Sequence, residues 1–104
     1  MTNHSFVNET LQVIVNQEFH INLKSTPSTG YIWEISELPG GIKPLGSFID
    51  QQQHESTAGG SSTQVFRFSA SLSGEFKISF ALKRSWESEA TQNHIILVQV
   101  KAGH

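Results

Sequence analysis

A chain of 104 residues with a formal net charge of -2 has the size of one domain, and we expect residues 1–104 to form a single domain with its own core. The scattered charges form no basic stripe for nucleic acid and no polybasic cluster for a membrane surface. No apolar run reaches the roughly 20 residues that span a bilayer. The absence of cysteine excludes disulfides, thiol chemistry and Cys-ligated zinc.

Apolar residues recur along the chain with a period of two, which predicts β-strands with one buried face. Phe19, Ile21 and Leu23 alternate with polar residues, for example, and no segment shows a helical stripe. In chain order, the predicted strands cover residues 11–15, 18–24, 31–36, 45–49 (a short edge strand), 63–70, 75–83 and 94–101.

Turn residues separate these segments. We expect a turn at Leu38 to Gly41, a tight hairpin turn at Ser71 to Gly74, and polar loops over residues 25–30, 50–62 and 84–93. Several short strands joined by such turns are typical of an all-β sandwich.

Side chains for catalysis or metal binding do not form a recognisable set. Asp50 is the sole aspartate, and Glu87 and Glu89 lie on a polar loop that we interpret as solvated. His20 and His94 fall on predicted strands and could be neighbours, but two histidines are too few for a metal site. No phosphate-binding glycine loop is present. We therefore expect neither an enzyme nor a cofactor.

The unusual residues lie in loops that a sandwich brings to one end. In the first loop, Pro27 restricts the backbone and Gly30 permits a sharp turn. The second loop carries a glycine pair, Gly59 and Gly60, which allows close approach to a partner. Locally, an ordinary turn and a linker remain alternative interpretations of these two loops.

The third loop places Trp86 two residues after Arg84, in polar surroundings. Trp and Arg are enriched at binding hot spots, so Trp86 is a candidate anchor. The alternative is an indole that folds back and closes the end of the core. In either case, the composition alone predicts a soluble sandwich that acts as a binding module.

Together, these loops resemble the chagasin-type inhibitors of cysteine peptidases, whose loops read N-P-T-T-G-Y, G-x-G-G and R-P-W. Here the first reads Thr26-Pro27-Ser28-Thr29-Gly30-Tyr31, the second Thr57-Ala58-Gly59-Gly60, and the third Arg84-Ser85-Trp86. The resemblance spans essentially the whole chain. It departs at Thr26, Ser28, the start of the second loop and Ser85.

The resemblance implies an immunoglobulin-like β-sandwich of about seven to eight antiparallel strands that blocks a papain-family protease without covalent chemistry. It places Thr29 near the catalytic Cys–His pair of the protease, the glycine loop on the unprimed side and Trp86 on the primed side, with Arg84 as support. The implied contact residues are Pro27, Ser28, Thr29, Gly30, Tyr31, Ala58, Gly59, Gly60, Ser61, Arg84, Ser85 and Trp86.

A second class of function stays open, because sandwiches of this kind also serve as adhesion or carbohydrate-binding modules. We expect a monomer. Met1 to Thr10 lacks the apolar segment of a secretory signal, so we expect a cytoplasmic protein if this N-terminus is native, and otherwise a mature secreted or periplasmic form.

Overall fold

The computed structural model of the protein describes residues 7–25, 30–50, 62–84 and 86–103. Within these ranges, no helix is long and apolar enough to cross a membrane. The strands are β1 (Glu9–Ile14), β2 (Glu18–Ser25), β3 (Tyr31–Glu37), β4 (Ile42–Asp50), β5 (Ser62–Ala70), β6 (Gly74–Arg84) and β7 (Gln92–Lys101).

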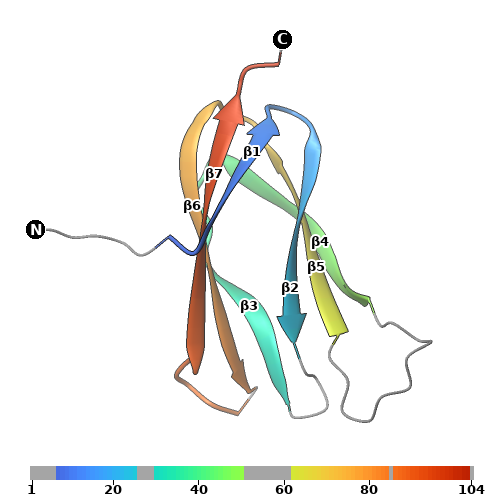
Figure 1. The fold of residues 1–104 in the computed structure, drawn as a ribbon, viewed down its shortest axis with the longest axis vertical. Helices are drawn as coiled ribbons and strands as arrows, with labels where there is room; N and C mark the ends of the chain where they lie inside the picture. The colour runs from blue at the N-terminus through green and yellow to red at the C-terminus, as the bar shows by residue number, and fades with distance from the viewer. Residues whose placement is uncertain (1–6, 26–29, 51–61, 85, 104) are drawn as a thin grey trace, which may run out of the picture.

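The strands form two sheets that pack face to face (Figure 1). Sheet A has the order β1-β7-β6-β3 and sheet B the order β2-β5-β4. Neighbouring strands are antiparallel, except that β1 runs parallel to β7. This arrangement is that of a two-sheet immunoglobulin sandwich, except that the first strand, β1, joins the sheet of the last strand, β7, and not the sheet of β2. The predicted all-β, immunoglobulin-like sandwich is confirmed.

The core lies between the inner faces of the two sheets. On β2, Ile21 and Leu23 are buried while Asn22 between them is exposed, as the period of two requires. Across the core, the ring centroids of Phe66 and Phe80 are 4.9 Å apart. Each fully buried side chain of this kind contributes about 1.5–3 kcal/mol. The largest fully buried side chains are Phe68, Phe80, Ile78, Ile96 and Val98.

The turn from Ser71 to Gly74 crosses from sheet B to sheet A, so the predicted hairpin is wrong. β5 ends at Ala70 and lies between β2 and β4, whereas β6 lies between β7 and β3. Because both edges of each strand are occupied, β5 and β6 cannot pair with each other. The β3–β4 connection crosses back at the same end, and the Ser71 N–H donates to the Gly41 carbonyl over 3.0 Å.

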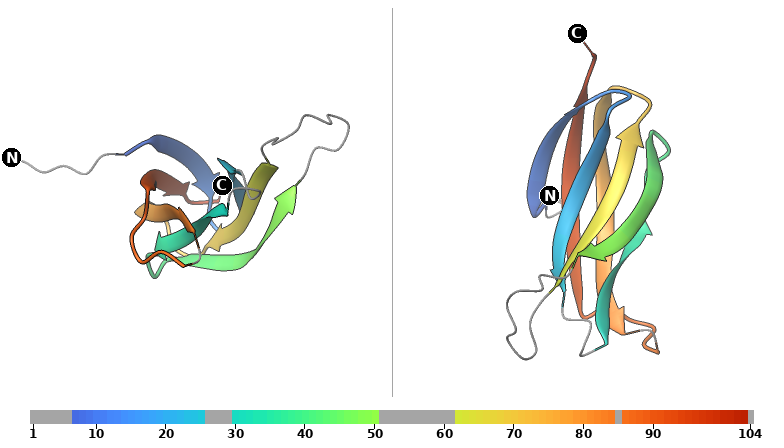
Figure 2. Two further views of the ribbon diagram at one scale, coloured as in Figure 1. Left: turned by 90° about the horizontal axis from the view of Figure 1, so that it is seen from below. Right: turned by 90° about the vertical axis from the view of Figure 1, so that its right-hand side faces the viewer.

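β4 forms one edge of sheet B, as Figure 2 shows, and is longer than predicted. It runs from Ile42 to Asp50 rather than over residues 45–49. The pairing register with β5 shifts between Pro44 and Gly46, and Gly46 has a φ of 137°. An edge strand tolerates proline at such an irregularity because its free side needs no N–H donor. This proline obscured the first half of the strand in the sequence.

Candidate functional site

Three connections leave the sandwich at one end, joining β2 to β3, β4 to β5 and β6 to β7 (Figure 1). Ser25 pairs with Ser62 and Tyr31 pairs with Arg84, which brings the strand ends together. The prediction of a shared end is confirmed for these strand ends. We call this region the loop end and define it by Ser25, Tyr31, Asp50, Ser62, Arg84 and Gln92.

Of the predicted contact residues, the structure describes Gly30, Tyr31, Arg84 and Trp86. These residues belong to the first and third loops and to the strands that carry them. The other predicted contact residues lie outside the described ranges: Pro27, Ser28, Thr29, Ala58, Gly59, Gly60, Ser61 and Ser85.

Gly30, in the first loop, packs against Trp86 of the third loop. Its φ of 89° lies in the left-handed region, which disfavours any residue with a Cβ atom. The indole of Trp86 also packs over it. A Cβ atom on Gly30 would lie 3.2 Å from Cη2 of Trp86 and 3.6 Å from Cγ of Arg84. The glycine is therefore needed both for the turn and for the close approach of the third loop.

Arg84 lies against two aromatic rings at the loop end. Its Cζ atom is 4.4 Å from the ring centroid of Tyr31 and 5.5 Å from that of Trp86. A cation over a ring face is stabilising by about 0.5–1 kcal/mol at exposed sites. The Arg84 Nε is buried and has no hydrogen-bond partner among the described atoms. Ring contacts therefore account for much of how this guanidinium is held.

Trp86 projects from this cluster into solvent. It is 70% exposed, more than any other large hydrophobic side chain in the described ranges. An indole that closed the core would be buried, so that alternative is wrong. The core contains the other tryptophan, Trp33, which is only 7% exposed. Exposing an indole to water is unfavourable, so burying Trp86 against a partner surface would contribute favourably to the free energy of binding.

Glu87 belongs to this site, although its sequence context indicated a solvated loop. The Glu87 N–H donates to the Arg84 carbonyl over 3.0 Å, and the Arg84 N–H donates to the Glu87 carboxylate over 3.2 Å. The same carboxylate lies 4.0 Å from the Arg84 guanidinium. In the sequence, the three-residue spacing between Arg84 and Glu87 was the signal that could have indicated this contact.

Gln64 joins the two sheets close to the loop end, a role that no pattern in the sequence indicated. Its side chain accepts a hydrogen bond from the Trp33 N–H over 2.7 Å and donates to the Trp33 carbonyl over 3.1 Å. The Trp33 indole N–H donates to the Lys24 carbonyl over 2.9 Å. Because β3 is an edge strand, its free backbone groups need such partners when buried. These bonds fix β2, β3 and β5 relative to one another.

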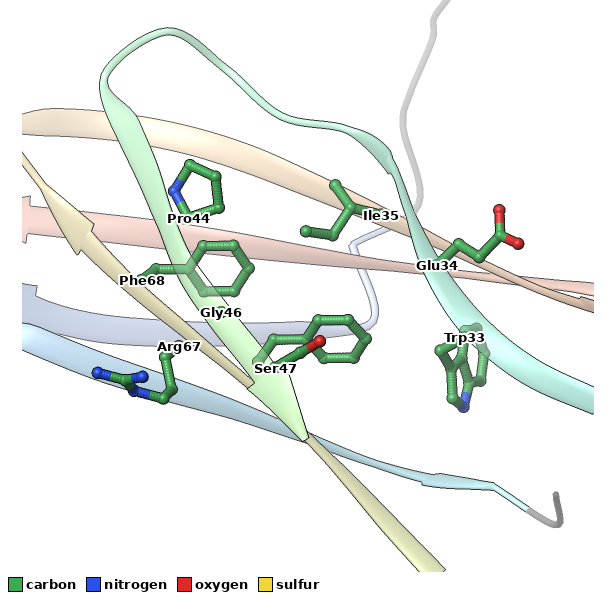
Figure 3. Close-up of a pocket in the computed structure, with 9 residues that line it drawn as sticks. Trp33, Glu34, Ile35, Pro44, Gly46, Ser47, Arg67 and Phe68 are labelled. Carbon is green, nitrogen blue, oxygen red and sulfur yellow. The ribbon is translucent and has the colours of Figure 1, made fainter. Parts of the chain in front are cut away.

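A cleft of about 300 Å³ lies between the free edges of β3 and β4. In Figure 3, Ile35, Pro44 and Phe68 surround it, while the charged ends of Glu34 and Arg67 point away. The Arg67 side chain is hydrogen-bonded to Glu18 instead. The cleft is thus an apolar gap between sheet edges and presents no acid–base pair.

An ion pair between Glu18 and Arg67 lies on the outer face of sheet B, away from the loop end. A 2.7 Å hydrogen bond from Arg67, with a second contact from His20 at 2.8 Å, lowers the pKa of Glu18 to about 2. His94 instead contacts Glu9 in sheet A. The two histidines therefore lie on different sheets, and the described residues contain no group of three potential metal ligands.

A family model described as chagasin family peptidase inhibitor I42 matches residues 12–100. The chain belongs to this family. Members of the chagasin family inhibit cysteine peptidases and are not themselves enzymes, so the predicted class of function is confirmed. No curated protein gives a significant match to the sequence.

Solved structures share the fold of this chagasin-family chain. The cysteine protease inhibitor EhICP2 from Entamoeba histolytica has a TM-score of 0.76 and 24% identity, over 91% of this chain and 88% of that one. Amebosin has a TM-score of 0.68 and 22% identity, with 88% of each chain covered. PbICP-C, in complex with falcipain-2, has a TM-score of 0.61 and 20% identity, over 97% of this chain and 96% of that one.

Proposed function

We propose that this chagasin-family chain inhibits papain-family, cathepsin L-like cysteine proteases by reversible, non-covalent occupation of the active-site cleft. The observation that carries the proposal is an exposed Trp86 held at the loop end by Arg84 and Gly30. Family membership supports it, as does the solved complex of the structurally similar PbICP-C with falcipain-2. Residues 1–104 then act as a single inhibitor domain.

The contact surface in this proposal combines residues 27–31, 58–61 and 84–86. Thr29 would lie beside the catalytic Cys–His pair, Gly59 and Gly60 along the unprimed side, and Trp86 on the primed side. A typical protease–inhibitor contact buries about 1,600 Å² in total, which three loops can supply.

The physical advantage of this surface is that part of it is ordered before binding. Immobilising a flexible side chain on association costs about 0.5–1.5 kcal/mol. The contacts of Trp86 with Arg84 and Gly30 reduce that cost for the indole. The chain has no cysteine with which to form a disulfide to the protease thiol. Non-covalent occupation of the cleft, as proposed, should be competitive, reversible on dilution and without cleavage of the inhibitor.

A papain assay tests the proposal. Initial rates with a fluorogenic peptide at several substrate concentrations should show competitive inhibition. Trp86→Ala should raise Ki by about thirtyfold, the equivalent of a 2 kcal/mol hot spot. The matched control is Leu72→Ala, which removes a 58% exposed apolar side chain from the opposite end of the sandwich and should leave Ki unchanged.

Two results would contradict the proposal. One is the absence of papain inhibition at micromolar inhibitor. The other is an equal effect of Trp86→Ala and Leu72→Ala on Ki, which would place the contact elsewhere. A positive glycan array without protease inhibition would instead favour a carbohydrate-binding module.

A further inference from the structure

The turn that presents Trp86 is closed by a side chain that is not one of the expected contact residues. In this turn, Glu87 bonds to both backbone groups of Arg84: its N–H to the carbonyl over 3.0 Å, and its carboxylate to the N–H over 3.2 Å. Both bonds span the same four residues. Trp86 therefore lies in a segment that two hydrogen bonds between Arg84 and Glu87 close, and not on an open loop.

The Glu87 carboxylate also acts on the Arg84 side chain, from which it lies 4.0 Å. The guanidinium in turn has its Cζ 5.5 Å from the centroid of the Trp86 ring. Arg84 is thus held by the carboxylate and by Tyr31, and it supports one side of the indole. Both ionic side chains are about two-thirds covered, with exposures of 36% and 32%. Each is less hydrated than a free surface group, which favours a defined geometry.

The residue type inside the turn makes this support necessary. Residue 85 is a serine, a residue type whose φ angle is less restricted than that of proline, which is held near -65°. An unrestricted residue beside an exposed anchor increases the entropy lost on binding. The two hydrogen bonds between Arg84 and Glu87 reduce that loss without a proline.

We propose that Glu87 is a positioning residue of the inhibitor: it closes the turn of residues 84–87 and holds Arg84 in the orientation that presents Trp86 to the protease. This role rests on the proposed function, because it concerns the same contact surface. It adds a residue that need not touch the protease at all. Its effect on binding should pass through Trp86.

The test combines inhibition with a direct measure of indole order. Glu87→Ala should raise the Ki for papain about three- to tenfold, the cost of ordering one side chain. Glu87→Gln keeps an acceptor for the Arg84 N–H and should recover most of the loss. The matched control is Glu89→Ala, which removes the same charge from an exposed position of the same loop and should leave Ki unchanged.

A double-mutant cycle shows whether Glu87 acts through the indole. In a Trp86→Ala background, Glu87→Ala should no longer change Ki, since there is no anchor left to position. The ¹⁵N heteronuclear NOE of the indole N–H provides a readout that needs no protease. It should fall for Trp86 in Glu87→Ala, while the buried Trp33 indole serves as an internal standard.

Specific results would overturn the inference. They are an unchanged Trp86 NOE in Glu87→Ala, an effect on Ki no larger than that of Glu89→Ala, or a loss that persists in full in the Trp86→Ala background. If the wild-type chain fails to inhibit papain, the proposed function fails, but the NOE comparison still decides whether Glu87 orders Trp86.

Discussion

Replacing Gly30 by alanine separates the two reasons for a glycine at the loop end. The substitution adds one methyl group at a residue whose φ is 89°. Backbone strain in this region costs a residue with a Cβ atom about 1–2 kcal/mol. The new Cβ would also lie 3.2 Å from Cη2 of Trp86, closer than an ordinary contact.

The strain should dominate the loss of stability. Because the Trp86 indole is 70% exposed, it can move by a few tenths of an ångström at little cost. We therefore expect Gly30→Ala to lower the free energy of unfolding by about 1–2 kcal/mol. For a domain of this size, that lowers Tm by about 4–8 °C for each kcal/mol. The displaced indole should also raise the Ki for papain.

Thermal and urea unfolding, together with Ki, provide the measurements. Gly40→Ala is the matched control: a Cβ there meets nothing within 4 Å, its φ lies outside the left-handed range, and stability should change by less than about 0.5 kcal/mol. In a Trp86→Ala background, Gly30→Ala should cost the same stability as in the wild type. If the cost disappears there, a steric clash with the indole and not backbone strain is the cause, and our reasoning is refuted.

Two further predictions concern the frame beneath the loops. Gln64→Ala removes both hydrogen bonds to the Trp33 backbone and should lower the free energy of unfolding in urea by roughly 2–4 kcal/mol. The control Gln12→Ala, at an exposed residue, should lower it by less than about 0.5 kcal/mol. Equal losses would argue against a stabilising role for the Gln64–Trp33 bonds. The pKa of Glu18 is lowered from 4.5 to about 2 chiefly by Arg67, so its ion pair stabilises the fold above pH 4.5 and loses this effect as pH falls towards 2. Glu18→Gln should therefore lower Tm at pH 7 and lower it progressively less as pH falls towards 2, and a Tm difference as large at pH 2 as at pH 7 would contradict this assignment.

The strands were predictable because burial on one face leaves a direct trace in the residue order. Ile21 and Leu23 alternate with exposed neighbours in the sequence and in the structure alike. Where the trace is interrupted, the prediction is weaker, as at Pro44 in β4. The path between sheets leaves no such trace. Ser71 to Gly74 looks like a hairpin turn because its length and residue types suit either connection.

The residues of the candidate site likewise differ in how far the sequence could identify them. Gly30 and Trp86 are unusual residues for their surroundings, so they could be identified from the sequence alone. Gln64 and Glu87 are ordinary polar residues, and their roles depend on a partner. The partner of Gln64 is Trp33, 31 residues away in the chain. No local pattern specifies such a contact.

The position of β7 has a consequence for the synthesis of the protein. β7 lies between β1 and β6, and Gln12 on β1 bonds to Gln99 on β7, 87 residues later. At a ribosomal rate of about 5–20 residues per second, the nascent β1 waits roughly 4 to 17 s for its neighbour. Sheet A therefore cannot form completely until β7 has been synthesised. Until then, the unpaired edges of β1 and β6 are open to pairing with other chains.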